Sequence, residues 1–173
     1  MESGRLIFVD EFGVHLAMTR THARAPQGER AEVCEKFERG AKMSAISAMG
    51  LRGVFAPMVI EGSIDQLVFD HYVEFLLVPN LLHRDLVMLD NISFHYSPRA
   101  SSLIEAAGAS VEYFPAYSPD FNPIEECISK IKAILRKLKP ETERALLKSL
   151  AFALEQISFS DILGWFKHCG YNT

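Results

Sequence analysis

The sequence lacks a cysteine pattern. Its three cysteines, Cys34, Cys127 and Cys169, are odd in number and far apart, and the chain contains neither a Cys-x-x-Cys pair nor the Cys/His spacing of a zinc site. A disulfide framework would show an even number of cysteines in a short, loop-rich chain. The three residues are therefore interpreted as reduced thiols, which are typical of a cytoplasmic protein.

Positive charge and long apolar runs are also scarce. The 18 Lys and Arg residues against 22 Asp and Glu residues give a net charge of −4, which is not the broad basic footprint of a protein whose main role is gripping DNA. Any contact with nucleic acid must then come from local basic faces. The longest apolar run, residues 73–82, is interrupted by Glu74, Pro79 and Asn80, and no signal peptide is seen, so we expect neither a membrane span nor secretion.

What the chain does contain is enough apolar material for one core. It has 173 residues, 49% of them hydrophobic, and 12 Phe, which suits a single domain covering residues 1–173. Apolar periodicity and turn residues predict strands at 6–16, 42–49, 54–60, 85–90 and 110–114. Helices are expected from residue 63 to Pro79, from 97 to 108, from 122 to 138, and at 140–156 and 159–169. Strands followed by crossover helices predict an α/β fold: a mixed sheet of about five strands with helices on both faces.

Helix boundaries follow from capping residues. Ser63 with Gln66 and Ser158 with Asp161 each have the spacing of a capping box, and Asn122 followed by Pro123 marks another helix start. Two apolar stripes are expected to face the core, and the first of them comprises Ile64, Leu67, Val68, Tyr72, Phe75 and Leu76. The second, in the helix after Pro123, comprises Ile124, Ile128, Ile131, Leu135 and Leu138.

Three acids occupy places where an acid is costly. Asp10 and Asp90 each follow an apolar run, and Glu125 lies in the first turn of a helix, with 34 residues between Asp90 and Glu125. A carboxylate desolvated beside a core costs free energy unless a cation or several donors offset it. Alternation along the first strand places Asp10 on the face of Phe8 and Phe12, opposite Glu11, which favours Asp10 only weakly over its neighbour. Three converging carboxylates would repel one another, and a shared divalent metal is the simplest remedy.

Each acid also has an ordinary structural explanation. Asp10 and Asp90 would be unremarkable as solvated acids at strand ends, and Glu125 sits three residues after Asn122, where it would complete a capping box. Glu126 is the rival for the role of Glu125, although a surface pair with Lys130 explains it adequately.

Three sequence blocks resemble the catalytic blocks of DDE transposases. They are Phe8-Val-Asp-Glu-Phe-Gly13, Leu89-Asp-Asn-Ile-Ser-Phe-His95 and Tyr117-Ser-Pro-Asp-Phe-Asn-Pro-Ile-Glu125. The chain is most similar to bacterial insertion-sequence transposases related to the mariner elements, whose second and third acids have the same 34-residue gap, and the likeness extends over roughly residues 5–171. One departure is Ile128, which stands where this family usually has Trp.

This resemblance implies a ribonuclease-H-like fold and an Mg²⁺-dependent endonuclease that cuts element ends and joins the DNA 3′-hydroxyl to TA target sites. The catalytic and metal-binding residues would be Asp10, Asp90 and Glu125, holding two Mg²⁺ ions that Mn²⁺ can replace. Asn91 and His95 match the second block and are candidates for supporting the active site. His95 could contact a water molecule or DNA, or it could make only a structural hydrogen bond. It is not expected to be a metal ligand.

Further expectations concern partners. Ser129, Lys132 and Arg136 continue along the helix face of Glu125 and are candidate DNA-binding residues, although a solvated charged face is the competing explanation. Relatives carry helix-turn-helix domains before the catalytic core, and none is seen here, so the expected partners are DNA, a helix-turn-helix-bearing half or full-length transposase, and a second copy in a homodimer. The resulting location is a bacterial cytoplasm, at the nucleoid when DNA is bound. The alternatives are an inactive or regulatory fragment that partners such a transposase, and a ribonuclease-H-like nuclease acting on RNA–DNA hybrids.

Overall fold

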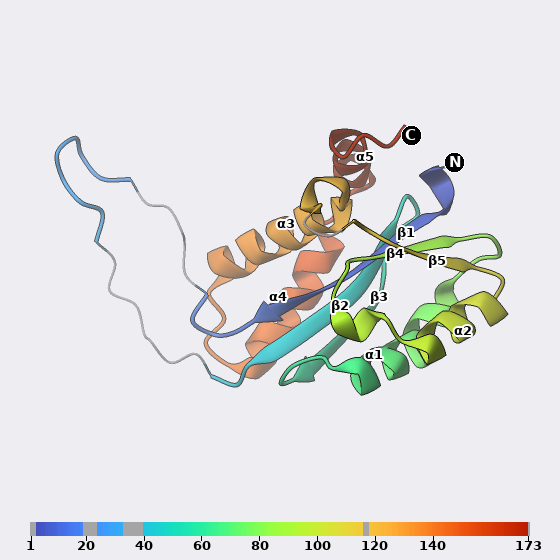
Figure 1. Cartoon of the computed structure of the whole chain (residues 1–173). Helices are drawn as coiled ribbons and strands as arrows, with labels where there is room; N and C mark the ends of the chain where they lie inside the picture. The colour runs from blue at the N-terminus through green and yellow to red at the C-terminus, as the bar shows by residue number, and fades with distance from the viewer. Residues whose placement is uncertain (1–2, 19–23, 33–39, 116–117, 173) are drawn as a thin grey trace.

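A mixed five-stranded sheet forms the centre of the computed structural model, which describes residues 3–18, 24–32, 40–115 and 118–172. The strands run in the order β3-β2-β1-β4-β5 (Figure 1). β1 pairs antiparallel with β2, and β2 with β3, whereas β1–β4 and β4–β5 are parallel pairs. The mixed sheet predicted from the sequence is thus confirmed. The strands are β1 (Leu6–Val14), β2 (Met43–Gly50), β3 (Gly53–Glu61), β4 (Leu86–Leu89) and β5 (Ser110–Tyr113).

Helices cover both faces of this sheet (Figure 1). On one face lie α3 (Pro123–Leu138), α4 (Glu143–Glu155) and α5 (Phe159–His168), and on the other lie α1 (Gln66–Tyr72) and α2 (Pro98–Ala106). Shorter helical turns complete the described chain: η1 (Ser3–Arg5), the π-helical η2 (Val73–Leu77), η3 (Val78–Asn80), η4 (Ser93–His95) and η5 (Pro119–Phe121). The predicted fold class, about five strands with helices on both faces, is confirmed.

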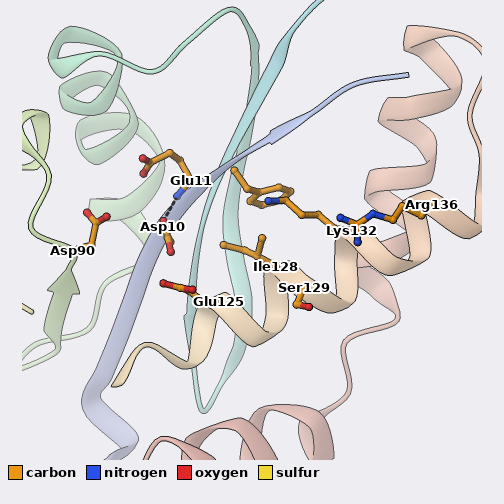
Figure 2. Close-up of a pocket in the computed structure, with 9 residues that line it drawn as sticks. Asp10, Glu11, Asp90, Glu125, Ile128, Ser129, Lys132 and Arg136 are labelled. Atoms are coloured by element: carbon orange, nitrogen blue, oxygen red, sulfur yellow. Dashed lines mark hydrogen bonds between the residues drawn. The ribbon is translucent and has the colours of Figure 1, made fainter. Parts of the chain in front are cut away.

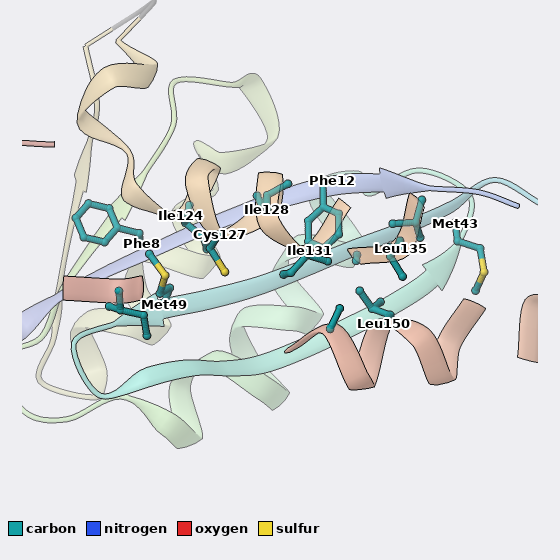
Figure 3. Close-up of a cluster of buried hydrophobic side chains, with 14 of the residues drawn as sticks. Phe8, Phe12, Met43, Met49, Ile124, Cys127, Ile128, Ile131, Leu135 and Leu150 are labelled. Atoms are coloured by element: carbon teal, nitrogen blue, oxygen red, sulfur yellow. The ribbon is translucent and has the colours of Figure 1, made fainter. Parts of the chain in front are cut away.

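The two faces of β1 bury two separate apolar clusters. Phe8 and Phe12 face α3, while Ile7 and Val9 face α1 and α2, as period-two alternation predicts. Figure 3 shows the cluster under α3, where Ile124, Ile128 and Ile131 pack on the sheet. The α3 stripe was predicted correctly except at its end, because Leu138 is 44% exposed where the helix runs past the sheet.

The start of α1 differs from the prediction. Asp65, not Ser63, caps the helix, since Asp65 Oδ1 accepts from the Val68 backbone N–H at 2.9 Å. The Ser63 hydroxyl instead accepts from Lys42 Nζ at 3.1 Å. The negative charge of a carboxylate is stabilised by the positive end of the helix dipole, which explains why Asp65 rather than Ser63 caps the helix.

The apolar stripe of this segment is also displaced. Leu67 and Phe75, both predicted to be buried, are 61% and 64% exposed. Ile64 and Tyr72 are buried as predicted, and Val68 and Leu76 are partly buried against the same core. Phe69, Val73 and Leu77 are buried although they were not predicted to be. After Tyr72 the helix widens into a π turn, in which the Val78 N–H bonds the Val73 carbonyl, and the extra residue rotates the later side chains around the axis. A regular 3.6-residue period cannot anticipate that rotation, which applies to Phe75; Leu67 lies before the π turn.

Among the described residues, the helices are all too short or too polar to cross a bilayer.

Candidate active site

Two of the predicted acids lie side by side on neighbouring parallel strands. Phe8 of β1 pairs with Met88 of β4, so Asp10 stands level with Asp90, two residues further along each chain. β4 ends at Leu89, which places Asp90 just beyond its last ladder position. β1 continues to Val14 against β2, so Asp10 is held by a strand on one side and open on the other.

The third acid comes from α3. Glu125 is in the first turn of this helix, which packs on the Phe8 and Phe12 face of β1, the same face that carries Asp10. Figure 2 shows Asp10 between Asp90 and Glu125. The three acids line one cavity of about 470 Å³, together with Glu11, Phe12, Ile128, Ser129, Lys132 and Arg136.

Negative charge in this cavity is poorly compensated. The pKa of Asp10 is raised to about 7, first by burial and then by the charges of Glu11 and Asp90. The pKa of Glu125 is also raised, by burial and by Asp90, although Lys132 acts in the opposite direction. Without a cation, the protein therefore carries carboxylates that resist ionising together.

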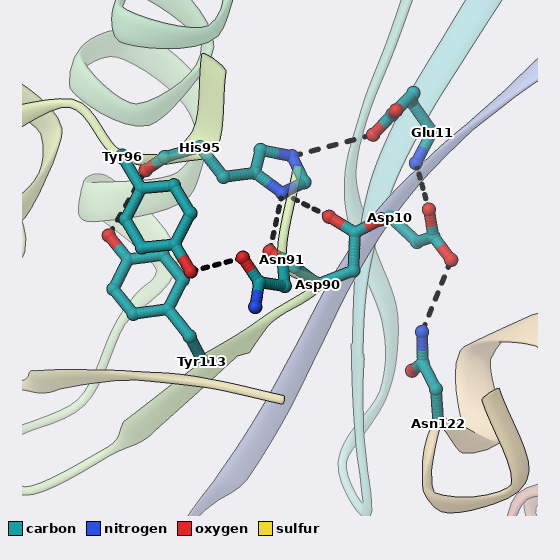
Figure 4. Close-up of polar contacts among 8 residues, drawn as sticks. All are labelled: Asp10, Glu11, Asp90, Asn91, His95, Tyr96, Tyr113 and Asn122. Carbon is teal, nitrogen blue, oxygen red and sulfur yellow. Dashed lines mark hydrogen bonds and ion pairs between the residues drawn. The ribbon is translucent and has the colours of Figure 1, made fainter. Parts of the chain in front are cut away.

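Asp10 has two donors of its own. Its Oδ1 accepts from the Glu11 backbone N–H at 2.7 Å and its Oδ2 from Asn122 Nδ2 at 3.2 Å (Figure 4). Asn122 occupies the N-cap position of α3, as predicted, but makes no side-chain cap bond, because its amide is directed to Asp10 instead. Asn122 is buried, with 3% of its surface exposed. Its hydrogen bond to Asp10 links the helix that carries Glu125 to the strand that carries Asp10. It was not identified as a site residue from sequence.

His95 is fully buried behind the acids. Its Nδ1 lies 2.5 Å from Asp90 Oδ1, and its Nε2 lies 3.4 Å from Glu11 Oε2 (Figure 4). Burial lowers the pKa of His95, but hydrogen bonds to Asp90 and Glu11 outweigh it and raise that pKa to about 9. Asn91 is not among the residues lining the cavity and accepts a hydrogen bond from the Tyr96 hydroxyl.

Glu11 is the residue that sequence reasoning set aside. Alternation places it on the face opposite Asp10, as predicted, but it still lines the cavity at the edge of β1 and pairs with His95. Its position directly after Asp10 was visible in the sequence, whereas its partner, far along the chain, was not.

Glu126, the rival for the role of Glu125, has a different partner from the one predicted. The predicted pair between Glu126 and Lys130 is wrong: Lys130 Nζ contacts Asp161 at 2.5 Å, and Glu126 lies 3.7 Å from His168. Both contacts follow from α5 packing against α3, which brings tertiary partners closer than the next helical turn does.

A basic face adjoins the acids. Ser129, Lys132 and Arg136 follow Glu125 along α3 and line the same cavity. Lys132 Nζ lies 5.8 Å from the centre of the Phe12 ring, so its ammonium stays at the cavity wall. The cavity therefore has an acidic end and a cationic end.

The donor set suits a hard divalent cation in chemistry and charge. Asp10, Asp90 and Glu125 offer only carboxylate oxygens, the ligands that Mg²⁺ prefers, and a cation would relieve the repulsion that raises the pKa of Asp10 and Glu125. Within the residues that the structure describes, no three His, Cys, Asp or Glu side chains form a ready ligand cage. The acids thus share a cavity, and closing them on an ion would require side-chain movement.

The sheet order, the two helical layers and the acids on β1, after β4 and on α3 define a ribonuclease-H-like fold. Residues 5–147 match the family described as DDE superfamily endonuclease, and the chain belongs to this family. The resemblance stated from the three sequence blocks is confirmed at that level. No curated protein matches the chain.

Solved structures agree on the fold. The chain is similar to a pre-cleavage Mos1 transpososome, with a TM-score of 0.79 and 16% identity over 96% of this chain and 53% of that one. It also resembles the catalytic domain of Mos1 mariner transposase, with a TM-score of 0.73 and 15% identity over 97% and 78% of the two chains. The chain spans about half the length of the transposase chain in the transpososome.

Proposed function

We propose that this chain is the catalytic domain of a DNA transposase, which hydrolyses phosphodiester bonds at element ends and joins the resulting 3′-hydroxyl to target DNA. The observation that carries the proposal is the cavity shared by Asp10, Asp90 and Glu125, three acids from separate elements within the residues that match the family. The assignment of these three residues as catalytic and metal-binding is part of the proposal.

Asp10, Asp90 and Glu125 would hold two Mg²⁺ ions, or Mn²⁺ in their place. Bound there, the ions would supply charge neutralisation and activation of the attacking oxygen at a scissile phosphate. Solved Mos1 paired-end complexes contain Mg or Mn, which supports this choice of cofactor. The protein's own contribution is to position the carboxylates: the Glu11 amide and Asn122 orient Asp10, and His95 contacts Asp90.

The cationic end of the cavity would bind the DNA backbone. Lys132 and Arg136 would contact phosphates that flank the cut, with Ser129 donating a hydroxyl closer to Glu125. The net charge of −4 makes this local face, rather than the protein's overall field, the source of DNA affinity. Mos1 structures with a left transposon end and after strand transfer give a precedent for DNA on this fold.

End recognition would require further parts. We propose that a helix-turn-helix-bearing transposase polypeptide and a second catalytic copy join this domain at transposon ends and TA targets. The domain would then supply chemistry, and its partner would supply sequence reading.

The test is nicking of duplex DNA by the purified chain with Mg²⁺ or Mn²⁺. Asp90→Asn should abolish nicking, while Glu155→Gln, which changes an exposed acid at the end of α4, away from the cavity lining, should retain it. Equal nicking by wild type and Asp90→Asn would refute the assigned site. Adding a helix-turn-helix-bearing partner, and replacing the duplex by an RNA–DNA hybrid, would separate a transposase domain from a hybrid-specific nuclease.

A further inference from the structure

A buried imidazole joins two carboxylates at the back of the acid cavity. The ring of His95 packs against Phe69 and Phe94, with centroid distances of 4.6 and 4.7 Å, and is fully shielded from solvent. Its two nitrogens face Asp90 and Glu11, and both of these acids line the cavity. The imidazole itself does not line it. His95 therefore reaches the cavity only through these two side chains.

The ring is fixed from several sides. The hydroxyl of Tyr113 donates to the His95 carbonyl at 3.1 Å, and Tyr113 stacks on Tyr96 with ring centroids 4.4 Å apart. With Phe69 and Phe94 against the imidazole, rotation about its side-chain bonds would break its packing against both rings. A fixed ring holds Nδ1 at one place, and the Asp90 oxygen beside it is held there too.

Packing alone does not explain this residue. Burying a histidine with two carboxylates is costly, and an apolar side chain of similar size would fill the space beside the two phenylalanines at lower cost. Asp90 has its side chain 35% exposed and Glu11 23%, so both acids reach from the buried ring toward open cavity. The buried His95 thus costs free energy as core packing but contacts two acids of the cavity, which indicates that its role is to position them.

We propose that His95 and Glu11 are positioning residues for Asp90. His95 Nδ1 lies 2.5 Å from Asp90 Oδ1 and 3.4 Å from the Asp90 carbonyl oxygen, which leaves the other carboxylate oxygen as the one offered to a divalent cation, and Glu11 holds the imidazole through Nε2. The inference rests on the proposed function, because it assigns Asp90 to a cation site. Partners of this kind behind a metal ligand typically change metal affinity by about 10- to 100-fold.

Two substitutions of similar size separate the effects of the two ring nitrogens of His95. In His95→Asn the amide nitrogen falls near the position of Nδ1, so a donor to Asp90 is kept, whereas in His95→Gln it falls near Nε2, so only the Glu11 side keeps one. The dissociation constant of Mn²⁺, followed by the electron paramagnetic resonance signal of free Mn²⁺, should rise about 10-fold or more in His95→Gln. In His95→Asn it should rise no more than about threefold. Equal constants in both variants and wild type, or equal losses in both, would overturn the proposal.

A double-mutant cycle tests whether Glu11 acts through His95. Glu11→Gln should weaken Mn²⁺ binding in the wild-type background and have no further effect in His95→Asn, where the Nε2 contact is already lost. If Glu11 binds the ion directly, its substitution will weaken binding equally in both backgrounds, and the positioning role of Glu11 is overturned.

A metal-free measurement completes the test even if His95 variants do not fold. In ¹⁵N-labelled wild type with chelator present, the buried Nδ1–H should give a slowly exchanging, downfield imidazole resonance that Asp90→Asn shifts upfield or removes. No such resonance, or one that Asp90→Asn leaves unchanged, would overturn the proposal. Wild-type protein that shows this resonance and the Mn²⁺ effects but does not nick DNA, alone or with a helix-turn-helix-bearing partner, would refute the proposed function while the positioning of Asp90 stands.

Discussion

The first turns of α3 and α5 start from the same local pattern and are used differently. Each has a polar residue at the N-cap and an acid three residues later: Asn122 and Glu125 in α3, Ser158 and Asp161 in α5. In α5 both capping-box bonds form, with Asp161 N donating to Ser158 Oγ at 3.2 Å and Ser158 N to Asp161 Oδ2 at 2.8 Å. In α3 neither side chain caps: Asn122 bonds Asp10, and Glu125 faces the cavity.

Electrostatics separates the two acids. The pKa of Asp161 is lowered to about 2, by hydrogen bonds from Lys130 and then from Ser158, whereas burial and Asp90 raise the pKa of Glu125. A carboxylate that finds local donors stabilises its helix, and one deprived of them beside other acids is available to a cation. The comparison thus distinguishes an acid that stabilises the fold from an acid placed for chemistry.

The sharpest way to test this difference is to neutralise each acid in turn. Glu125→Gln should reduce metal-dependent DNA nicking at least about a hundredfold, because it removes a charge at the proposed site, and should leave thermal stability equal or slightly higher. Asp161→Asn should keep nicking but lower stability by about 1 kcal/mol through the weakened cap. Nicking rates and melting temperatures of both variants measure this, and loss of nicking in Asp161→Asn alone would reverse the assignment.

The next largest effect concerns the two cap residues. Asn122→Ser supplies a good N-cap that is too short to reach Asp10, so we expect nicking to fall about 10-fold with no loss of stability. Ser158→Asn exchanges one good cap for another in α5 and should change neither quantity appreciably. If Asn122→Ser is as active as wild type, the bond to Asp10 does not orient that carboxylate.

The sequence was sufficient for much of the fold because periodicity is local. Alternation along β1 placed Asp10 and Glu11 on opposite faces correctly, and the Ser158–Asp161 capping box formed as predicted. The three acids were selected from their places after apolar runs or in a helix's first turn and from the resemblance of three blocks to the family, and the structure brings them to one cavity.

What sequence reasoning missed depends on distant contacts. The bond from Asn122 to Asp10 joins residues 112 positions apart, and the pairing of His95 with Glu11 requires β1 and the turn after β4 to be placed first. Asn122 and Ser158 both have the local sequence of an N-cap residue, but only Ser158 makes the side-chain cap bond. The π turn after Tyr72 is a similar case, because a sequence pattern predicts a regular α-helix and does not show where an extra residue enters a turn.

The pH dependence of stability should differ in direction for Asp10 and Asp161. Because the pKa of Asp10 is raised to about 7, the folded protein binds a proton there between about pH 4 and 7 that the unfolded chain has released, so stability falls as pH rises through that window. In metal-free protein, Asp10→Asn should melt several degrees higher than wild type at pH 8 and at about the same temperature near pH 4.

Asp161 supplies the opposite case. Its lowered pKa means that its contribution is present above about pH 4 and is lost as pH falls toward 2, so the destabilisation by Asp161→Asn should disappear in acid. Melting curves of both variants with chelator present, from pH 2 to pH 8, measure both effects. A destabilised Asp10→Asn at pH 8 would contradict the account of uncompensated charge in the cavity.

The smallest expected effect lies further along the same two helices. Lys132 in α3 lines the acid cavity, whereas Lys167 in α5 is exposed and does not. If Lys132 neutralises one phosphate, Lys132→Gln should reduce the slope of log affinity for duplex DNA against log salt by about 0.9, and Lys167→Gln should leave the slope unchanged. Binding measured by fluorescence anisotropy over a salt series resolves this difference. Equal slopes for both variants would mean that the face following Glu125 is solvated like that of α5, and the comparison between the helices would then hold only at their first turns.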